Sequence, residues 1–368
     1  MKVLFTLDSL GNAGTEKSTL DILSHFSRDI DVKVIYFYPG DHLKKAYEDA
    51  GIALQFVNVS GRMSILKGIN RLKKIIKDER PDVVVSSILR ANLISRIACK
   101  QTNTKIIGTF VSDSYSSIRK KSFSFKRRVG FYFYYQLDRF TARIPCAWVS
   151  NSECIKKSNC RFLQVDPGLV KVIYRGRDPQ KFISKEKTPS KGIFRFVYVG
   201  RLLQTKGLYE MLLGFKIVSE TYPAVSLDIY GEGNLRNNII QQIAQAGLQD
   251  KVTLHGAVPN GWEKLYEADC FIFPSWNEGF SGSLVEAMMV GIPIIASDIP
   301  MNLEAVTNNE TALIHKVKDA ESIGANMKAM IGSYDKMREM GMRARVEALK
   351  RFDIRAIAKE YQEYITTV

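Results

Sequence analysis

The sequence lacks long hydrophobic runs, closely paired cysteines and clustered histidines. No stretch of about 18 uninterrupted apolar residues occurs, so we expect no membrane-spanning helix. One lysine and a short apolar run precede Asp8, which predicts a first β-strand and not a signal peptide. The five cysteines include no CxxC pair and the four histidines lie far apart. We therefore expect reduced thiols of a cytosolic protein, with no disulfide framework and no zinc site.

Two further signatures of catalysis are missing. The sequence has no GxSxG motif and no combined cysteine and histidine motif, so nucleophilic hydrolysis has no support. Asp29-Ile30-Asp31 matches the D-x-D pattern of metal-dependent sugar transferases. However, this triplet comes just before a predicted strand, away from the carboxyl edge at which parallel sheets bind ligands. We therefore expect no metal site.

Acidic residues are scarce between positions 51 and 200, which hold 30 lysines and arginines against nine acids, a local excess of 21. The whole chain carries +15, so the remainder sums to −6. Residues 116–140 interleave cations with aromatics, which favours contact with an anionic membrane or an anionic acceptor, or else a solvated helix face over buried aromatics. Nucleic acid would fit the charge, but no nucleic-acid-binding motif accompanies it, so no such partner is expected. The cations are Arg119, Lys120, Lys121, Lys126, Arg127 and Arg128.

Short strands rich in β-branched residues alternate with helical patterns along the first half of the chain, from "KVLFTL" to "CAWVSN". These strands are apolar without regular alternation, which is typical of a parallel sheet covered on both faces. The pattern lapses in the charged stretch 177–194 and restarts at "FRFVYVGR". We therefore predict an α/β fold of two doubly wound domains, with a purely helical tail from Tyr334 to Val368.

Gly11 and Gly14 lie between the first predicted strand and the first predicted helix. Glycine lets the backbone approach a ligand closely, and the free N–H groups at a helix start favour an anion. The spacing matches neither GxGxxG nor a P-loop. The segment therefore predicts either a ligand-binding loop or an ordinary strand-to-helix turn.

Two cations follow the first strand of the second series, in "VYVGRLLQTKG". Arg201 ends the predicted strand, and Lys206 comes just before a glycine and a predicted helix. Two cations at the carboxyl edge of a parallel sheet suit a diphosphate, although ordinary solvated loop cations give the same pattern. The pair is therefore a candidate phosphate site.

Glu278 and Glu286 lie eight positions apart in "NEGFSGSLVEAMMVGIP". On one helix they would be separated by roughly 80° and would not share a face. The glycines and serines between them are poor in helix interiors, so we expect the helix to begin near Ser283 and Glu278 to lie in the loop. Ser283 and Glu286 then match a capping box. Glu278 would instead bind hydroxyls beside the free N–H groups of residues 280–283.

Together these motifs resemble the retaining glycosyltransferases of family 4, which have the GT-B fold. The strongest match is Glu278-x7-Glu286 within "FPSWNEGFSGSLVEAMMVGIPIIASDI", which is similar to the family's donor-binding signature. Further matches are "VGRLLQTKG", "LDIYGEG", "VTLHGAV", "VIYRGRDPQKF" and "VSNSE". The resemblance implies two Rossmann-like domains facing across a cleft. Residues 1–170, with a crossover helix at about 352–368, would bind the acceptor, and residues 171–351 would bind the donor.

The resemblance also implies roles for individual residues. Arg201 and Lys206 would neutralise the diphosphate of a nucleotide-sugar donor, so the chain would need neither a metal nor a cofactor. Glu286 would bind the ribose hydroxyls and Glu278 would face the transferred sugar. The implied catalytic residues are Glu278, Arg201 and Lys206. The further implied donor contacts are Gly11 and Gly14 in the first domain, and Gly279, Phe280, Ser281 and Gly282 in the second.

Two departures from the family pattern bear on the acceptor. Many members carry a histidine after the strand that matches "KIIGTF", where this chain continues with "VSDSYSS". Ser112 or Asp113 would take over that contact to the sugar. Arg175 and Arg177 stand where an asparagine and an apolar residue are more usual. They would contact an anionic acceptor or pair with neighbouring acids.

By this resemblance the chain would be a metal-independent hexosyltransferase that retains the anomeric configuration. It would move a sugar from a nucleotide-diphosphate-sugar onto a lipid-linked or polysaccharide acceptor in cell-surface glycan biosynthesis, for example that of lipopolysaccharide. It would act in the cytoplasm, held peripherally on the inner face of the membrane by the basic segment 116–140. Two alternatives are a nucleotide-sugar epimerase on a GT-B scaffold and a non-catalytic binder of anionic membrane or nucleic acid.

Overall fold

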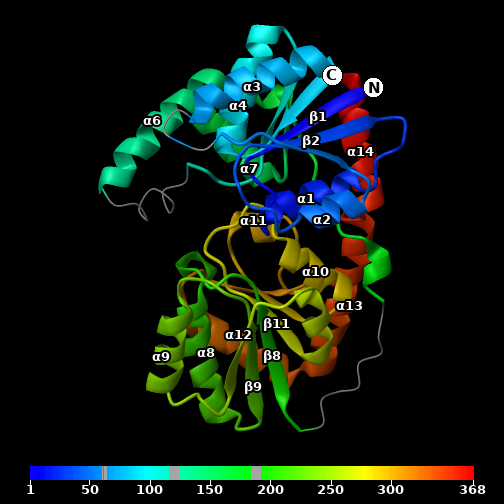
Figure 1. The fold of residues 1–368 in the computed structure, drawn as a ribbon. Coiled ribbons are helices and arrows are strands. Elements are labelled where there is room, and N and C mark those ends of the chain that lie inside the picture. Colours follow the sequence, from blue (N-terminus) through cyan, green and yellow to red (C-terminus); the bar gives the residue numbers. More distant parts are fainter. Residues whose placement is uncertain (60, 62–63, 116–124, 184–191) are drawn as a thin grey trace. The chain divides into compact units, whose positions relative to one another are not determined.

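A computed structural model describes residues 1–59, 61, 64–115, 125–183 and 192–368, without the side chains of residues 125–127. The chain forms two compact units (Figure 1). The first unit comprises Met1–Gly176 and Ile354–Val368, and the second comprises Arg177–Asp353. Each unit has its own parallel sheet and its own hydrophobic core.

The described part of the first unit is built on a seven-stranded sheet in the order β3-β2-β1-β4-β5-β6-β7. Every neighbouring pair of strands runs parallel, and Val3 of the interior strand β1 lies between Val32 and Val83. The strands are β1 (Lys2–Leu7), β2 (Asp31–Tyr36), β3 (Ala53–Phe56), β4 (Val83–Ser86), β5 (Lys105–Phe110), β6 (Ala147–Ser150) and β7 (Val170–Val172).

Helices cover both faces of this sheet, because successive residues of β1 point to opposite faces and both sets are buried. Val3 and Phe5 pack with Tyr361 of the last helix, whereas Leu4 packs with Leu72 and Ile94 on the other face. The helices are α1 (Gly14–Leu23), α2 (Lys44–Asp49), α3 (Ser64–Glu79), α4 (Leu89–Thr102), α6 (Phe125–Thr141), α7 (Glu153–Leu163), the short η1 (Pro167–Leu169) and α14 (Ile354–Thr367).

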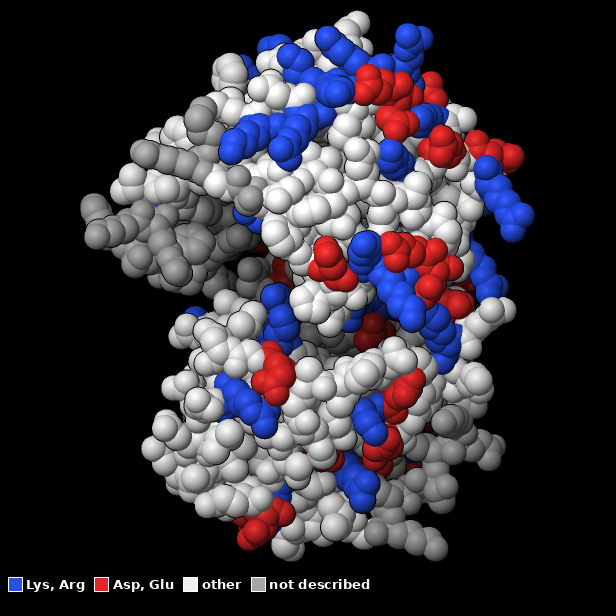
Figure 2. Space-filling view, viewed as in Figure 1, with Lys and Arg blue, Asp and Glu red and all other residues white. Residues whose placement is uncertain are grey.

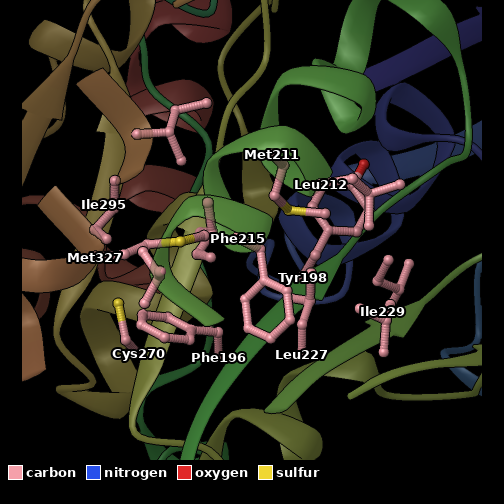
Figure 3. Packing of buried hydrophobic residues seen from close by; sticks show 14 of the residues in the cluster. Phe196, Tyr198, Met211, Leu212, Phe215, Leu227, Ile229, Cys270, Ile295 and Met327 are labelled. Atoms are coloured by element: carbon pink, nitrogen blue, oxygen red, sulfur yellow. The ribbon is translucent and has the colours of Figure 1, made fainter. Parts of the chain in front are cut away.

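The second unit has, in its described residues, a six-stranded parallel sheet in the order β10-β9-β8-β11-β12-β13. Phe196 and Tyr198 point from its centre into a core that also holds Phe215 and Met327 (Figure 3). The strands are β8 (Phe194–Val199), β9 (Val225–Tyr230), β10 (Val252–Gly256), β11 (Cys270–Phe273), β12 (Ile294–Ser297) and β13 (Leu313–His315).

Two helices of the second unit approach each other closely at a glycine. A Cβ on Gly214 would lie 2.8 Å from the carbonyl oxygen of Ala320, so only glycine fits there without a shift of the backbone. The α-helices are α8 (Leu208–Thr221), α9 (Arg236–Gln245), α10 (Gly282–Val290), α11 (Pro300–Leu303), α12 (Ala320–Gly332) and α13 (Tyr334–Arg351). The 3-10 turns are η2 (Pro179–Lys181), η3 (Gln204–Lys206) and η4 (Gly261–Glu267).

The order of strands reverses once in each sheet. In the first unit the reversal lies between β1 and β4, and in the second it lies between β8 and β11. Open parallel sheets bind ligands beyond the carboxyl ends of the strands at such a reversal, because the loops of the two strands diverge there. These two positions therefore locate the candidate sites.

The predicted fold class is confirmed, with two doubly wound parallel-sheet units and a last helix that returns to the first unit. The tail from Tyr334 is helical as predicted, but Phe352 and Asp353 divide it into α13 and α14. Apolar residues of α14 join the core of the first unit, which holds the returning helix in place. No helix within the described ranges combines the length and the apolar character needed to cross a bilayer.

Candidate active site

The loops that follow β8 and β11 flank the reversal in the second unit. They carry Arg201, Lys206 and Glu278, three residues that the sequence had marked for a donor. The two strands are direct neighbours, with Cys270 beside Phe196, so their loops start next to each other. These residues are far apart along the chain but lie together at one edge of one sheet.

Arg201 is the exposed cation of this edge. Its guanidinium makes no ion pair with any residue that the structure describes. Its carbonyl oxygen accepts a hydrogen bond from the buried hydroxyl of Tyr198, at 3.0 Å. A Cβ on Gly200 would lie 2.6 Å from that hydroxyl, so the glycine makes room for the bond. The backbone at Arg201 is thus fixed while its charge stays accessible.

Gly207 joins the two loops. Its φ of +67° lies in the left-handed region, and a Cβ there would come within 2.1 Å of the carbonyl oxygen of Pro274. The Trp276 backbone N–H also donates to the Thr205 carbonyl at 2.8 Å. The glycine therefore allows the loop that carries Lys206 to pack directly against the loop that carries Glu278.

Lys206 and Glu278 form an ion pair, which the sequence did not predict. The Lys206 ammonium donates to Oε1 of Glu278, and each side chain is only 12% exposed. A pair this far from water is more strongly coupled than a surface pair. Burial raises the pKa of the Tyr198 hydroxyl above its usual range, and the nearby Glu278 charge adds to this effect. The two predicted donor residues therefore act as a pair, in which the cation fixes the orientation of the acid.

The second acid, Glu286, lies inside α10 and not at its cap. The helix begins at Gly282, its N-cap is Ser281, and no side chain caps it with a hydrogen bond. The predicted capping box of Ser283 and Glu286 is therefore wrong, because Ser283 is already the second residue of the helix. The prediction that Glu278 lies in the preceding loop is confirmed.

Arg177 is the partner of Glu286. Its Nε donates to Oε1 of Glu286 at 2.7 Å, with the side chains 15% and 20% exposed. A Cβ on Gly282 would lie 1.8 Å from Nη2 of Arg177, so the absence of a side chain at this position makes room for the guanidinium. Of the two alternatives for Arg177, the structure shows pairing with a neighbouring acid.

The remaining residues of the predicted donor loop differ in accessibility. Phe280 is buried at 1% exposure, and its ring contacts that of Phe352 in a tilted arrangement with the centroids 5.3 Å apart, so its side chain anchors the loop. Gly279 and Ser281 are partly exposed. The first N–H groups of α10, from Gly282 on, lack a side-chain cap, and a helix start of this kind favours an anion.

A polar cluster behind the loop was missed by the sequence. The Ser297 hydroxyl donates to the Ser275 carbonyl at 2.5 Å, and Asn302 donates through Nδ2 to the Ser297 hydroxyl at 2.9 Å. All three residues are almost fully buried. Because they lie on three separate elements, no spacing in the sequence could have linked them. They fix the start of the loop that ends at Glu278.

The first unit has its own polar group at its strand reversal. Asp8 follows β1 and accepts from the backbone N–H of Ala91 at 2.8 Å and from Nε of Arg90 at 3.0 Å. Burial raises the pKa of the Asp8 carboxyl, and the Arg90 charge partly offsets that effect. Ile88, two positions before Arg90, has a φ of +75°, a strained conformation for a β-branched residue. This pair could not be predicted from the sequence, because 82 positions separate Asp8 from Arg90.

Gly11 lies in the turn between β1 and α1, as predicted from the sequence, whereas Gly14 is the first residue of α1 and not part of the turn. A Cβ on Gly14 would lie 3.0 Å from Nη1 of Arg175, so this arginine reaches the start of α1. The predicted donor contacts of the two glycines stay predictions.

Ser112 and Asp113 follow β5, one strand away from the reversal. Asp113 accepts from the Ser158 hydroxyl at 2.7 Å, and the Ser112 carbonyl accepts from Nδ2 of Asn159 at 3.1 Å. Both residues thus connect this loop to α7. Their predicted contact to the sugar stays a prediction. Of the basic segment 116–140, residues 116–124 and the side chains of 125–127 lie outside the described residues.

No cluster of three or more potential metal ligands occurs among the described side chains. This applies also to the Asp29-Ile30-Asp31 triplet, whose first two residues precede β2. The expectation that the reaction needs no metal stays untested.

Comparison with known proteins agrees with this fold. The model of the family "Glycosyltransferase Family 4" matches residues 13–181, and that of "Glycosyl transferases group 1" matches residues 179–347. Capsular polysaccharide biosynthesis glycosyltransferase CapH of Staphylococcus aureus is 24% identical over 320 residues, 83% of each chain. Uncharacterized glycosyltransferase MJ1059 of Methanocaldococcus jannaschii is 28% identical over 247 residues, 64% of this chain and 60% of that protein.

Solved structures share the fold over the full length. The crystal structure of Anabaena Alr3699/HepE in complex with UDP has a TM-score of 0.85, with 19% identity and 100% of both chains covered. The lipopolysaccharide outer core galactosyltransferase WaaB has a TM-score of 0.76, with 16% identity and 100% of both chains covered. In sequence, by contrast, the chain spans only about half of several curated relatives, between 44% and 60% of their length. The two family models together extend from residue 13 to residue 347, and by them the chain belongs to glycosyltransferase family 4.

Proposed function

We propose that this chain transfers a sugar from a nucleotide-diphosphate-sugar to a lipid-linked or polysaccharide acceptor in cell-surface glycan biosynthesis. The observation that carries the proposal is the group of Arg201, Lys206 and Glu278 at the strand reversal of the second unit. It is supported by the relative CapH, named for capsular polysaccharide biosynthesis, and by structures of Alr3699/HepE with UDP and with UDP-glucose.

The proposed reaction breaks the bond between the anomeric carbon and the diphosphate oxygen. Negative charge then builds on the diphosphate, which fixed cations and helix N–H groups stabilise. Lys206 is held in place by Glu278, and Arg201 is exposed at the same edge. Together with the uncapped start of α10, they supply positive charge without a bound metal.

The two acids contact different parts of the donor in this proposal. Glu278 binds hydroxyls of the transferred sugar, oriented by its ion pair with Lys206. Glu286 binds the ribose hydroxyls, and its pairing with Arg177 does not prevent this, because a carboxylate offers about four acceptor positions. Each acid therefore keeps its cation while the donor is bound.

Retention of the anomeric configuration completes the proposal. The acceptor oxygen attacks from the face that the diphosphate leaves, and the leaving phosphate oxygen takes the acceptor proton. A new bond from the acceptor oxygen to the anomeric carbon replaces the bond to the diphosphate, and Glu278 need not act as a nucleophile. The acceptor contacts assigned to the first unit are Ser112, Asp113 and Arg175, and Gly11 and Gly14 are assigned as donor contacts.

The test is donor turnover by the purified chain with a panel of nucleotide-sugars, with products separated by chromatography. Glu278→Gln keeps the shape of the side chain and removes its charge, so we expect a loss of kcat of about 100-fold or more. Glu321→Gln, on the exposed first turn of α12, is the matched control and should leave kcat unchanged. Wild-type turnover by Glu278→Gln would refute the site. If the chain instead formed an epimerised donor in the absence of acceptor, its activity would be epimerisation and not transfer.

A further inference from the structure

One face of α6 exposes large apolar side chains to solvent. Val129, Tyr132, Phe133 and Phe140 are 62%, 61%, 65% and 72% exposed. Phe133 and Phe140 are more exposed than any other phenylalanine in the described chain. Folded proteins rarely leave contiguous apolar residues in water without a partner. We call these four residues the aromatic stripe.

The aromatic stripe follows the helical repeat. At about 100° per residue its four members fall within an arc of roughly 100°, and they extend over about 16 Å along the helix. Asp138 lies on the opposite side and is buried, and Tyr135, about 60° beyond Tyr132, donates its hydroxyl to the Phe162 carbonyl at 2.9 Å. The side of the helix toward the protein thus makes polar and aromatic contacts, the latter between Tyr115 and the rings of Phe131 and Tyr135, whereas the apolar residues of the stripe face solvent.

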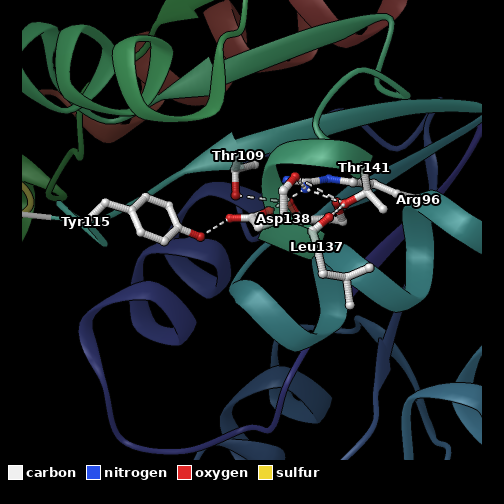
Figure 4. A network of polar contacts seen from close by, with 7 residues as sticks. Arg96, Thr109, Tyr115, Leu137, Asp138 and Thr141 are labelled. Atoms are coloured by element: carbon white, nitrogen blue, oxygen red, sulfur yellow. Dashed lines mark hydrogen bonds and ion pairs between the residues drawn. The ribbon is translucent and has the colours of Figure 1, made fainter. Parts of the chain in front are cut away.

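A buried network fixes the inner side of α6 (Figure 4). Nη1 of Arg96 in α4 donates to Oδ1 of Asp138 at 2.5 Å, and the two side chains are 1% and 7% exposed. The Tyr115 hydroxyl donates to the other carboxylate oxygen, and Thr141 accepts from Arg96 at 3.2 Å. Such a network holds the helix in one rotational setting. The stripe therefore faces outward because the buried contacts fix the helix, and not because the helix is frayed.

Positive charge accompanies the stripe. Arg128 and Arg139 fall at one border of its arc, next to Tyr132, and Arg128 is exposed. α4 packs against both α6 and α3, and α3 adds further cations. Figure 2 shows blue side chains gathered where Figure 1 labels α3 and α4. The exposed cations of α3 are Lys67, Arg71, Lys74 and Lys77.

We propose that the aromatic stripe of α6 inserts into the interface of an anionic lipid bilayer. Tyrosine and phenylalanine suit the boundary between headgroups and acyl chains, while arginines at the border meet anionic headgroups. The cations at the border and on α3 favour anionic lipid over a second copy of this equally basic chain. The inference rests on the proposed function, because a lipid-linked acceptor would be held at that same surface.

The experiment measures co-sedimentation of the full chain with vesicles of phosphatidylglycerol and phosphatidylethanolamine at about 0.1 M and about 0.5 M salt. Phe133→Ser/Phe140→Ser removes two members of the stripe, and we expect at least about a tenfold loss of binding at both salt concentrations. Val346→Ser is the matched control, since Val346 on α13 is 68% exposed but lies outside the stripe. It should bind as the wild type does.

A charge variant separates the two contributions. Arg128→Gln/Arg139→Gln should weaken binding at low salt and matter little at high salt, because salt screens the electrostatic part. Equal binding by wild type and Phe133→Ser/Phe140→Ser would overturn the proposal. Self-association that those substitutions abolish, without vesicle binding by the wild type, would assign the stripe to a second copy. Nucleotide-sugar hydrolysis in solution, measured on the same variants, should not change, so the proposed function is tested separately.

Discussion

The ion pair of Lys206 and Glu278 makes the sharpest prediction of the candidate site. We consider Lys206→Met, which keeps the length of the side chain and removes its charge, Glu278→Gln, and the double variant. Each partner is 12% exposed, so either single change leaves the other charge largely out of water without its partner. The double change leaves no such charge.

The magnitude follows from this burial. Loss of one partner of a mostly buried pair should cost about 2–3 kcal/mol of unfolding free energy. For a unit of this size that corresponds to a fall in Tm of roughly 4–10 °C. The double variant should lose at least about 1 kcal/mol less than the sum of the single losses, because the two residues are in direct contact.

The assay is thermal unfolding of the four proteins, followed by urea unfolding to convert the Tm shifts into free energies. Lys264 and Glu267 provide a matched control pair, since they are 35% and 57% exposed and pair at 2.8 Å. Their cycle should give a coupling much smaller than that of Lys206 and Glu278, because water and salt screen an exposed pair. Additive losses at Lys206 and Glu278, equal to those of the control pair, would refute the reasoning that the two residues act as one unit.

Two other predictions concern residues of the second unit, Arg177–Asp353. Gly282→Ala should displace the Arg177 guanidinium from Glu286 and weaken donor binding several-fold, with a stability change within about 1 kcal/mol, because the lost ion pair and the stiffer backbone offset each other. Calorimetric titration with the donor checks this against Gly332→Ala, whose added Cβ meets nothing within 4 Å, and equal affinities for both would contradict it. Burial lowers the pKa of His315, so the folded state keeps it neutral while the unfolded chain takes up a proton below about pH 6.5. Stability should therefore fall as pH drops from about 6.5 to 5, by up to about 1.4 kcal/mol per pH unit, and His315→Asn should reduce that slope in Tm measured against pH; equal slopes would exclude His315 as the cause.

The architecture could be predicted from the sequence because the patterns that indicate a parallel sheet covered on both faces lie within short segments. Apolar strands without alternation, each followed by a helical pattern, can be read one segment at a time. The glycines and serines between the two acids placed Glu278 in the loop and Glu286 in the helix, and the structure confirms both positions. The fold class and the positions of the motif residues at the carboxyl edges followed from such local signals.

The partners of those residues could not be predicted in the same way. Lys206 and Glu278 are 72 positions apart, and Arg177 and Glu286 are 109 apart. Charged residues at either position fit a ligand or each other equally well, so only the three-dimensional contact decides. The predicted capping box had the same weakness, because an acid at the right spacing bonds instead to an arginine from outside the helix.

The central claim is that the second unit binds a nucleoside diphosphate at the edge formed by Arg201, Lys206 and Glu278. The most direct measurement is the Tm of the wild type and of Lys206→Met with UDP, GDP and ADP, each at saturating concentration. At about 100 times the Kd, one of these nucleotides should raise the wild-type Tm by about 5 °C or more. The same nucleotide concentration should leave the Tm of Lys206→Met almost unchanged. No shift of the wild type by any nucleoside diphosphate, or an equal shift of both proteins, would contradict the account.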